Sequence, residues 1–349
     1  MNDLILPAGY EPKLGVREVE VAIKEIKDFL EKNLAKALNL TRVTAPTFVK
    51  TGTGINDDLN GTERPIRFRV REYGDGEVEI VQSLAKWKRL ALARYGFREG
   101  EGLYTDMNAI RPDDRLDNLH SIYVDQWDWE RVIASEARTR GTLEETVRAI
   151  YDVVRRTELY VASHYASIHP CLPREIAFVT SEDLCARFPG ASPREREERI
   201  VREHGAVFVM GIGADLADGQ PHDGRAPDYD DWITPRPDGG RGLNGDILVW
   251  NPVLERSFEI SSMGIRVNAA SLREQLKIRG VEERETLLFH RAHRGGGRRG
   301  LAARDGGGLR AGEHLPALSA RARSARRQQH AHRQLVVWFR PIPLREVDL

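Results

Sequence analysis

The sequence predicts an α+β fold, an antiparallel sheet flanked by helices, and three patterns point to this class. Segments in which apolar and polar residues alternate recur at short intervals between residues 66 and 130. Two long stretches with helical period, 16–38 and 142–165, stand on either side of them. The regular alternation of one strand with one helix, which is typical of a doubly wound parallel sheet, is missing.

The elements of the first half follow in order. The stretch 16–38 places its apolar residues on one helical stripe, so we expect a single amphipathic helix there. A strand at 40–49, with Pro46 near its end, and a Gly/Asn/Asp-rich loop come next. Further strands are expected at 66–70, 78–82 and 121–130.

The second half contains one helix with strong end signals. Ser192, Pro193 and Gly205 stand where an N-cap, a first-turn proline and a closing glycine belong, around a charged helix. Three buried strands are expected after it, at 206–212, 247–250 and 258–267.

The composition excludes several classes of protein. Basic and acidic residues balance at 53 each, whereas domains that bind nucleic acid in general are strongly basic. Two cysteines, Cys171 and Cys185, are too few for a disulfide scaffold or a cysteine-rich zinc site. The longest apolar run, 205–214, is far short of a membrane span of about 20 residues, and the N-terminus lacks a signal-peptide pattern. We therefore expect a soluble cytoplasmic protein.

The neutral total hides a change of composition near residue 293. Residues 291–333 hold eleven Arg, no Lys and two acids, a net charge of +9, which leaves residues 1–290 at about −9. Glycine and arginine at this density bury too little apolar surface to offset the entropy of ordering, so we expect a disordered tail over 293–349. The tail is a basic arm for nucleic acid, a segment without function, or the product of a shifted reading frame.

The strand expected before residue 131 carries the densest polar pattern. It presents Gln126, Asp128 and Glu130 on one face, and Trp127 and Trp129 on the other. The polar face is either exposed to solvent or, as the tryptophans favour, buried. Buried acids need cationic partners.

Three cations lie near this strand in the sequence. Arg111 leads into a polar loop that returns to it, so its guanidinium either forks onto a phosphate or carboxylate or is a surface group of a hairpin. Ser83 is the expected N-cap of a helix that carries Lys86 and Lys88. Positions two apart on a helix point different ways, so at most one of these lysines should line a site.

Further acids stand in the second half. Asp246 opens one predicted strand and Glu259 lies in the next, and Mg²⁺ takes one or two carboxylates with phosphate oxygens. The two are therefore either a magnesium site or surface acids. Arg266 follows a glycine bend and could return to the same pocket. The segment 225–232, taken alone, is an acidic surface loop.

Six segments of the chain share a pattern with one family. These long and rare motifs resemble the ammonia-dependent asparagine synthetases, the aspartate–ammonia ligases, and the likeness runs from about residue 16 to residue 292. They read Ser83-Leu-Ala-Lys-Trp-Lys-Arg, Gly100-Glu-Gly-Leu-Tyr-Thr, Tyr123-Val-Asp-Gln-Trp-Asp-Trp-Glu, Arg225-Ala-Pro-Asp-Tyr-Asp-Asp-Trp, Leu243-Asn-Gly-Asp-Ile-Leu-Val-Trp-Asn-Pro and Ser261-Ser-Met-Gly-Ile-Arg.

The resemblance implies a catalytic domain over residues 1–292 with the antiparallel sheet and helices of class II aminoacyl-tRNA synthetases. It implies a homodimer that uses ATP and Mg²⁺, without nucleic-acid or membrane partners. L-aspartate would be activated as β-aspartyl-adenylate, and ammonia would then give L-asparagine, AMP and pyrophosphate.

The resemblance also implies roles for individual residues. Arg111 matches the arginine of class II motif 2 and would stabilise charge on the α-phosphate. Lys88 and Arg266 would clamp the α-carboxylate of aspartate, which leaves the side-chain carboxylate facing ATP. Asp246 and Glu259 match the acids that hold Mg²⁺ on the triphosphate. The other substrate-binding positions are Asp57, Gln126, Asp128, Asp230 and Ser262.

The chain departs from the family pattern after residue 292. The family ends in Gly-Gly-Gly-Ile-Gly-Gln-Ser-Arg, whose arginine is the class II motif 3 contact to ATP phosphates. The codons of residues 301–311, read one nucleotide downstream, permit Leu-Pro-Leu-x-x-Gly-Gly-Gly-x-Gly-Gln. This favours a one-base slip near His293, so that the tail is translated out of frame. Because the chain then lacks motif 3, we expect its activity to be impaired. The motif 3 role is not transferred to Arg310, because its flanks do not match.

Two other functions stay open. An aspartyl- or asparaginyl-tRNA synthetase-like enzyme would share the adenylate chemistry, but residues 1–15 leave no room for a tRNA-binding module. A non-catalytic nucleic-acid-binding paralogue would use the arm at 291–333, and its binding would be steeply salt-dependent.

Overall fold

An eight-stranded sheet forms the centre of the fold. The computed structural model describes residues 7–56, 59, 63–73, 76–113, 121–286 and 317–321. The strands pair in the order β1-β5-β6-β11-β10-β9-β8-β7, and every pair from β5 to β8 is antiparallel, while β1–β5 and β7–β8 are parallel. The expected antiparallel α+β class is therefore confirmed. The strands are β1 Leu40–Arg42, β5 Gly102–Ile110, β6 Tyr123–Val132, β7 Ala177–Thr180, β8 Ala206–Met210, β9 Asn244–Asn251, β10 Arg256–Ile265 and β11 Ala317–Arg321.

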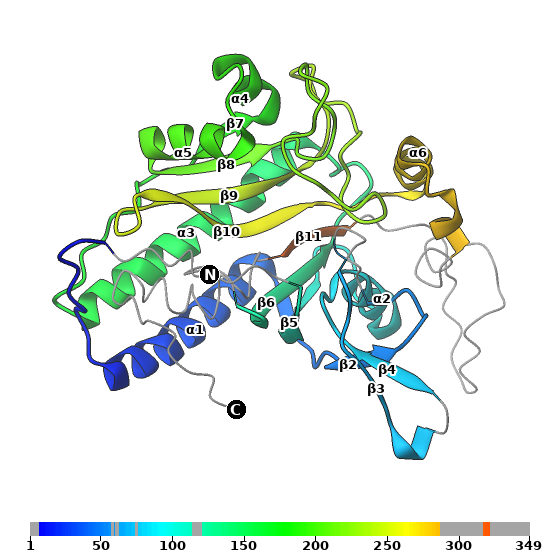
Figure 1. Ribbon diagram of the computed structural model, residues 1–349, viewed down its shortest axis with the longest axis horizontal. Helices are drawn as coiled ribbons and strands as arrows, with labels where there is room; N and C mark the ends of the chain where they lie inside the picture. The colour runs from blue at the N-terminus through cyan, green and yellow to red at the C-terminus, as the bar shows by residue number, and fades with distance from the viewer. Residues whose placement is uncertain are drawn as a thin grey trace.

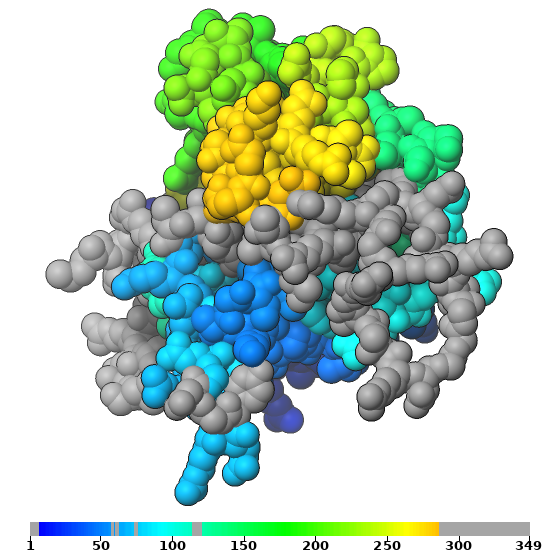
Figure 2. Space-filling view, turned by 90° about the vertical axis from the view of Figure 1, so that its right-hand side faces the viewer, coloured from blue at the N-terminus to red at the C-terminus, as the bar shows by residue number. Residues whose placement is uncertain are grey.

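A smaller antiparallel sheet, in the order β2-β4-β3, lies to one side of the large one, beside α2 (Figure 1). Figure 2 shows this sheet and α6 at the lower and upper parts of the same side of the molecule. Its strands are β2 Phe48–Lys50, β3 Arg67–Arg69 and β4 Glu77–Ile80. The described helices are α1 Val16–Leu38, α2 Ala85–Tyr95, α3 Arg140–His164, α4 Ser181–Arg187, α5 Pro193–His204 and α6 Ala269–Arg279, with 3₁₀ turns at Arg71–Tyr73 and Glu282–Thr286.

The helices cover the two faces of the large sheet separately. Phe208 belongs to the cluster with α1 and α3, whereas its neighbour Val207 packs against α4 and α5. Because successive side chains of a strand point to opposite faces, α1 and α3 share one face and α5 lies on the other. The second face also receives α2, whose Ala91 and Leu92 pack on β5 and β6.

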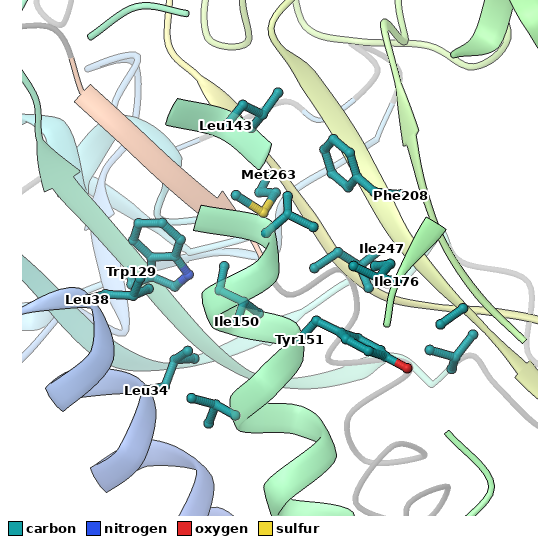
Figure 3. Close-up of a cluster of buried hydrophobic side chains, with 14 of the residues drawn as sticks. Leu34, Leu38, Trp129, Leu143, Ile150, Tyr151, Ile176, Phe208, Ile247 and Met263 are labelled. Atoms are coloured by element: carbon teal, nitrogen blue, oxygen red, sulfur yellow. The ribbon is translucent and has the colours of Figure 1, made fainter. Parts of the chain in front are cut away.

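The largest core cluster fills the space between the sheet and the helix pair α1 and α3 (Figure 3). Trp129, Ile150 and Phe208 are almost completely removed from solvent there. Burial of each such side chain contributes about 1.5–3 kcal/mol. This core holds the sheet as a rigid support for its other face. Figure 3 labels Leu34, Leu38, Trp129, Leu143, Ile150, Tyr151, Ile176, Phe208, Ile247 and Met263.

Several helix ends agree with the local sequence signals. The helix expected at 16–38 has these same bounds. Ser192 caps α5, since its hydroxyl accepts from the backbone N–H of Glu195 while the Glu195 carboxylate accepts from that of Ser192. The second long helix begins at Arg140, with Thr139 as its N-cap.

The prediction of one strand over 40–49 is wrong. The segment forms β1 and β2, which end up in different sheets, and Pro46 lies between them. Proline has no N–H to donate to a strand ladder, so the chain can leave the first sheet at this residue.

The tail contributes a strand, which its composition does not predict. Residues 317–321 form β11, which lies between β6 and β10 in the large sheet and is coloured orange in Figure 1. Apart from these five residues, the tail at 293–349 lies outside the described part of the chain. Among the described helices, none is both long and apolar enough to cross a membrane.

Candidate active site

One face of the large sheet carries a row of polar residues. Asp128 pairs with Thr105 on β5 and with Arg321 on β11, while Ser262 pairs with Arg321 and with Asp246 on β9. Cross-strand partners share a face. Asp128, Ser262 and Asp246 therefore lie in one row, on the face opposite the α1 and α3 core.

Lys88 of α2 reaches this row. Its ammonium donates to Asp128 Oδ1 over 2.8 Å and to the carbonyl of Trp129 over 3.3 Å. The Lys88 side chain is 0% exposed and that of Asp128 1%. Burial lowers the pKa of Lys88, while the charges of Asp128 and Glu130 oppose this shift. The predicted burial of the acidic face, and its cationic partner, are thus found.

The start of α2 holds a second buried lysine. Lys86 Nζ lies 2.9 Å from a carboxylate oxygen of Asp228, and both side chains are at most 3% exposed. We expected only one of the two lysines near a site, but the helix start is enclosed by β6 on one side and by the 225–232 segment on the other. The N-cap is Leu84 rather than Ser83, whose hydroxyl accepts from the backbone N–H of Ala85.

The segment 225–232 is buried and forms one wall of the site, in contrast to the surface loop that its acids suggest. Asp228, Asp230 and Asp231 are 0%, 8% and 0% exposed. Asp230 forms an isolated β-bridge and an ion pair with Arg266, which follows β10.

Tyr229 contacts Arg266 and Glu130. Its ring centroid lies 3.8 Å from the Arg266 guanidinium carbon, and its hydroxyl donates to Glu130 Oε2 over 2.9 Å. Glu130 lies on the same strand face as Asp128, two residues further along β6. The segment 225–232 is therefore joined to both β6 and the end of β10.

Gln275 of α6 fixes the main chain of this segment. Its amide oxygen accepts from the N–H of Trp232 over 2.9 Å, and its amide nitrogen donates to the carbonyls of Pro227 and Asp230 over 2.9 and 2.8 Å. Arg138 binds the Asp231 carboxylate and the Arg266 carbonyl.

Charges around the segment balance. Five cations and five acids lie close together, and most are fully buried, so substrate charge can enter only by exchange of partners. Burial lowers the pKa of Arg89, within this set, to about 10. The set comprises Lys86, Lys88, Arg89, Arg138, Arg266, Asp128, Glu130, Asp228, Asp230 and Asp231.

Arg111 lies at the end of β5, beside the start of α2. Its Nε and Nη2 donate to the carbonyl of Gln82 over 3.0 and 2.7 Å, and Gln82 N donates to Asn56 Oδ1 over 2.8 Å. The side-chain amide of Gln82 is buried and has no hydrogen bond with the described residues. Asp57, an expected substrate ligand next to Asn56, lies outside the described residues. Gln126 is buried on the same face of β6 as Asp128.

Asp246 and Glu259 lie on one face of adjacent strands. Asp246 is opposite Ser262, whereas Glu259 is opposite Leu248 beside a β-bulge, and both acids are buried. Asp246 Oδ1 accepts from Nη2 of Arg225 over 2.6 Å. Among the described residues, no cluster of three or more His, Cys, Asp or Glu side chains could hold a metal. Two carboxylates fit Mg²⁺ if phosphate oxygens complete its coordination.

The structure thus gathers most of the expected residues on one face, and adds four that the sequence did not single out for a role. Glu130 was visible on the polar face of its strand. Arg225 and Tyr229 lie in the segment 225–232, where the sequence pattern indicated only the acids. For Gln82, only the folded structure shows a buried amide.

Known proteins similar to this chain agree in family. A model of the aspartate–ammonia ligase family matches residues 17–309, and so continues beyond residue 292. An aspartate–ammonia ligase of Parabacteroides distasonis is 55% identical over 291 residues, 83% of this chain and 84% of that protein. One of Clostridium perfringens is 55% identical over 290 residues, with the same shares.

Solved structures agree in fold. An asparaginyl-tRNA synthetase of Entamoeba histolytica in complex with asparaginyl-adenylate has a TM-score of 0.61 at 13% identity, over 93% of this chain and 67% of that one. One from Pyrococcus horikoshii has a TM-score of 0.61 at 12% identity, over 92% and 66%. At such identity the likeness shows a class II synthetase core and no more. On the family match and the identity to its relatives, the chain belongs to the aspartate–ammonia ligase family.

Proposed function

We propose that the chain makes L-asparagine from L-aspartate, ammonia and ATP through β-aspartyl-adenylate, and releases AMP and pyrophosphate. The observation that carries the proposal is a pair of neighbouring buried ion pairs, Lys88–Asp128 and Arg266–Asp230. Burial lowers the pKa of Lys88 and the nearby charge of Arg266 adds to this, so the two cations lie close to each other.

The two pairs match the charges of an amino acid. The α-carboxylate of aspartate takes Lys88 and Arg266, and its α-ammonium takes the released carboxylates of Asp128 and Asp230. No buried charge is left without a partner by this exchange, which would otherwise cost several kcal/mol. Gln126, Ser262 and Asp57 complete the aspartate site.

Regioselectivity follows from this orientation. With its α-carboxylate held at the back of the pocket, aspartate can present only its side-chain carboxylate to the α-phosphate of ATP. Arg111 stabilises the negative charge that develops on that phosphate. Ammonia, a nucleophile in its neutral form, then attacks the activated carbonyl and displaces AMP.

The ATP site also takes Mg²⁺ in this proposal. Asp246 and Glu259 would hold the ion, and Mg²⁺ when bound neutralises the charge on the triphosphate. The buried Arg225 neutralises Asp246 until the metal takes its place.

Pyrophosphate release in the presence of aspartate, ATP, Mg²⁺ and ammonium tests the proposal, with asparagine quantified in the same samples. Whatever asparagine the chain makes, a small amount if its C-terminus is out of frame, should form only when all four are present. Charging of tRNA with aspartate, without asparagine formation, would instead favour a tRNA synthetase-like enzyme. Steeply salt-dependent nucleic-acid binding that is lost on truncation at residue 290 would favour the non-catalytic alternative.

We also propose that the chain acts in the cytoplasm, where ATP is plentiful, and as a homodimer. Val16 and Val21 on α1, and Phe48 and Phe68 on the small sheet, are large apolar side chains that remain 39–54% exposed. Exposed apolar groups of this kind are typical of surfaces that a second copy covers. Light scattering should give twice the chain mass of 39.5 kDa.

A further inference from the structure

We propose that Tyr229, anchored by Glu130, is a positioning residue that orients Arg266 toward the α-carboxylate of the substrate. The inference rests on the proposed function, since it concerns the same aspartate site. The resemblance assigns no role to either Tyr229 or Glu130.

The ring of Tyr229 supports the guanidinium of Arg266. The 3.8 Å separation is that of a cation–π stack, and both residues are only 1% exposed. Such stacks are strongest where water is excluded, and they fix the plane in which a guanidinium can donate. The ring therefore determines how Arg266 can meet a carboxylate.

The hydroxyl of Tyr229 fixes the ring itself. It donates to Glu130 Oε2 over 2.9 Å, and Glu130 is 0% exposed on the rigid strand β6. The other carboxylate oxygen, Oε1, is buried without a hydrogen bond to the described residues. Glu130 therefore offers the Tyr229 hydroxyl a buried acceptor on a fixed strand.

The main chain around Arg266 is held from both sides. The carbonyl of Tyr229 accepts from the N–H of Val267 over 3.0 Å, and Arg89 Nη2 donates to the Val267 carbonyl over 2.7 Å. The end of the Arg266 side chain is held by the stack on Tyr229 and by the ion pair with Asp230.

The ion pair of Arg266 with Asp230 cannot fix that end during binding, because the substrate exchanges with Asp230. The stack on Tyr229 can persist through the exchange. Tyr229 therefore keeps the guanidinium in its donating orientation while its anionic partner changes.

The test compares aspartate binding by calorimetry, and KM where turnover is measurable, in the full chain and its variants. Tyr229→Leu removes stack and anchor and should weaken aspartate binding about 30-fold, which corresponds to roughly 2 kcal/mol. Affinity for ATP should stay within about twofold, since the Tyr229 side chain acts on Arg266 and Glu130, on the aspartate side of the site. Tyr229→Phe keeps the stack and should lose only about 3–10-fold.

The matched control is Tyr151→Phe. Tyr151 is also buried, and its hydroxyl donates to the carbonyl of Pro173 over 2.7 Å, but it lies in the core on the opposite face of the sheet. This variant should lower thermal stability and leave aspartate affinity unchanged.

A double-mutant cycle tests the anchor without removing the ring. Tyr229→Phe and Glu130→Leu should each weaken aspartate binding. The double variant should bind aspartate no more weakly than the single variant that has the lower affinity. Glu130→Gln still accepts from the hydroxyl but lacks the charge that acts on Lys88 and Arg89, so any affinity it loses measures the charge and not the anchor. If the two single effects multiply, the anchor is refuted.

The outcomes separate this inference from the proposed function. If the unaltered chain is folded and binds no aspartate, the proposed function falls and this inference falls with it. If the unaltered chain and a folded Tyr229→Leu variant bind aspartate equally, only the inference is overturned.

Discussion

Lys88 carries a positive charge where water does not reach, and its acid–base behaviour should show in substrate binding. Burial lowers its pKa from the ordinary value of 10.5, because desolvation penalises the ammonium form. Only that form can hold a carboxylate, so aspartate affinity should fall as pH rises through the lowered pKa. In the interval between the lowered and ordinary pKa the unfolded chain keeps the proton that the folded one has lost, so this group adds stability as pH rises.

Aspartate binding measured from pH 7 upward checks this, with Lys88→Arg as the control. The amino group of aspartate titrates as well, but the ratio of the two dissociation constants cancels that effect. Arginine stays charged throughout, so the ratio should change in favour of the variant as pH rises. Parallel pH profiles would contradict the prediction.

Arg225 should compete with a metal for Asp246. Their charge-assisted hydrogen bond of 2.6 Å must open before Asp246 can bind Mg²⁺. Arg225→Gln should therefore tighten Mn²⁺ binding to the protein saturated with a nonhydrolysable ATP analogue by about tenfold, roughly 1.4 kcal/mol. Titration followed by electron paramagnetic resonance measures it.

Arg196→Gln is the control for charge alone, since Arg196 is a buried arginine that binds Asp218. It should leave Mn²⁺ affinity unchanged. Equal affinities in the unaltered chain and both variants would mean that Arg225 does not compete for this carboxylate.

At the scale of elements, α6 should affect the active site from outside it. Gln275→Ala would leave the N–H of Trp232 and the carbonyls of Pro227 and Asp230 without these partners. Unsatisfied buried groups of this kind cost about 1–3 kcal/mol each, so a loss of about 3 kcal/mol in the free energy of unfolding is expected. Aspartate affinity should fall as well, because Asp230 belongs to this segment.

Denaturant titration and calorimetry check both effects. Glu274→Ala, an exposed neighbour on the same helix, is the control and should change neither. A Gln275→Ala variant with normal stability would show that the segment does not depend on α6.

The element bounds that could be predicted from the sequence are those set by residues close together in the chain. The stripe at 16–38 and the Ser192 cap act within one element, so their bounds could be predicted from neighbouring residues. The split of 40–49 depends on pairing with strands some 30 to 60 residues away, and no short-range pattern encodes it.

The same distinction holds in the site. The polar face of β6 was visible as alternation. Lys88 and Arg266 were candidates from their local sequence, and only the resemblance gave them roles. The partners of these cations depend on tertiary contacts: Asp128 is 40 residues from Lys88, and Tyr229 is 99 from Glu130. The burial of both lysines was not expected and Tyr229 was missed, because a helix start and a loop look exposed until the surrounding elements cover them.

At the scale of the whole molecule, the tail should limit activity. We propose that residues 293–349 are read out of frame and so lack the phosphate-binding arginine of the family. Such a ligand typically contributes several kcal/mol to the transition state. An out-of-frame segment that must supply the central strand β11 also reduces a folding margin of about 5–15 kcal/mol. The unaltered chain should therefore make little asparagine and tend to aggregate.

A gene with the frame restored near codon 293 should give a soluble and active protein, measured beside the unaltered one in the pyrophosphate assay. Resequencing codons 285–312 is the complementary measurement. An intact frame in transcript and protein, or full activity of the unaltered chain, would refute the proposal.

The position of β11 has a consequence for synthesis. Its neighbours β6 and β10 end at residues 132 and 265, but the strand that joins them stops at residue 321. While the nascent chain leaves the ribosome, both neighbours present bare edges that readily recruit foreign strands. The sheet can close only after translation has passed residue 321. Chaperones that shield these edges should therefore determine what fraction of the synthesised chains reaches the folded state.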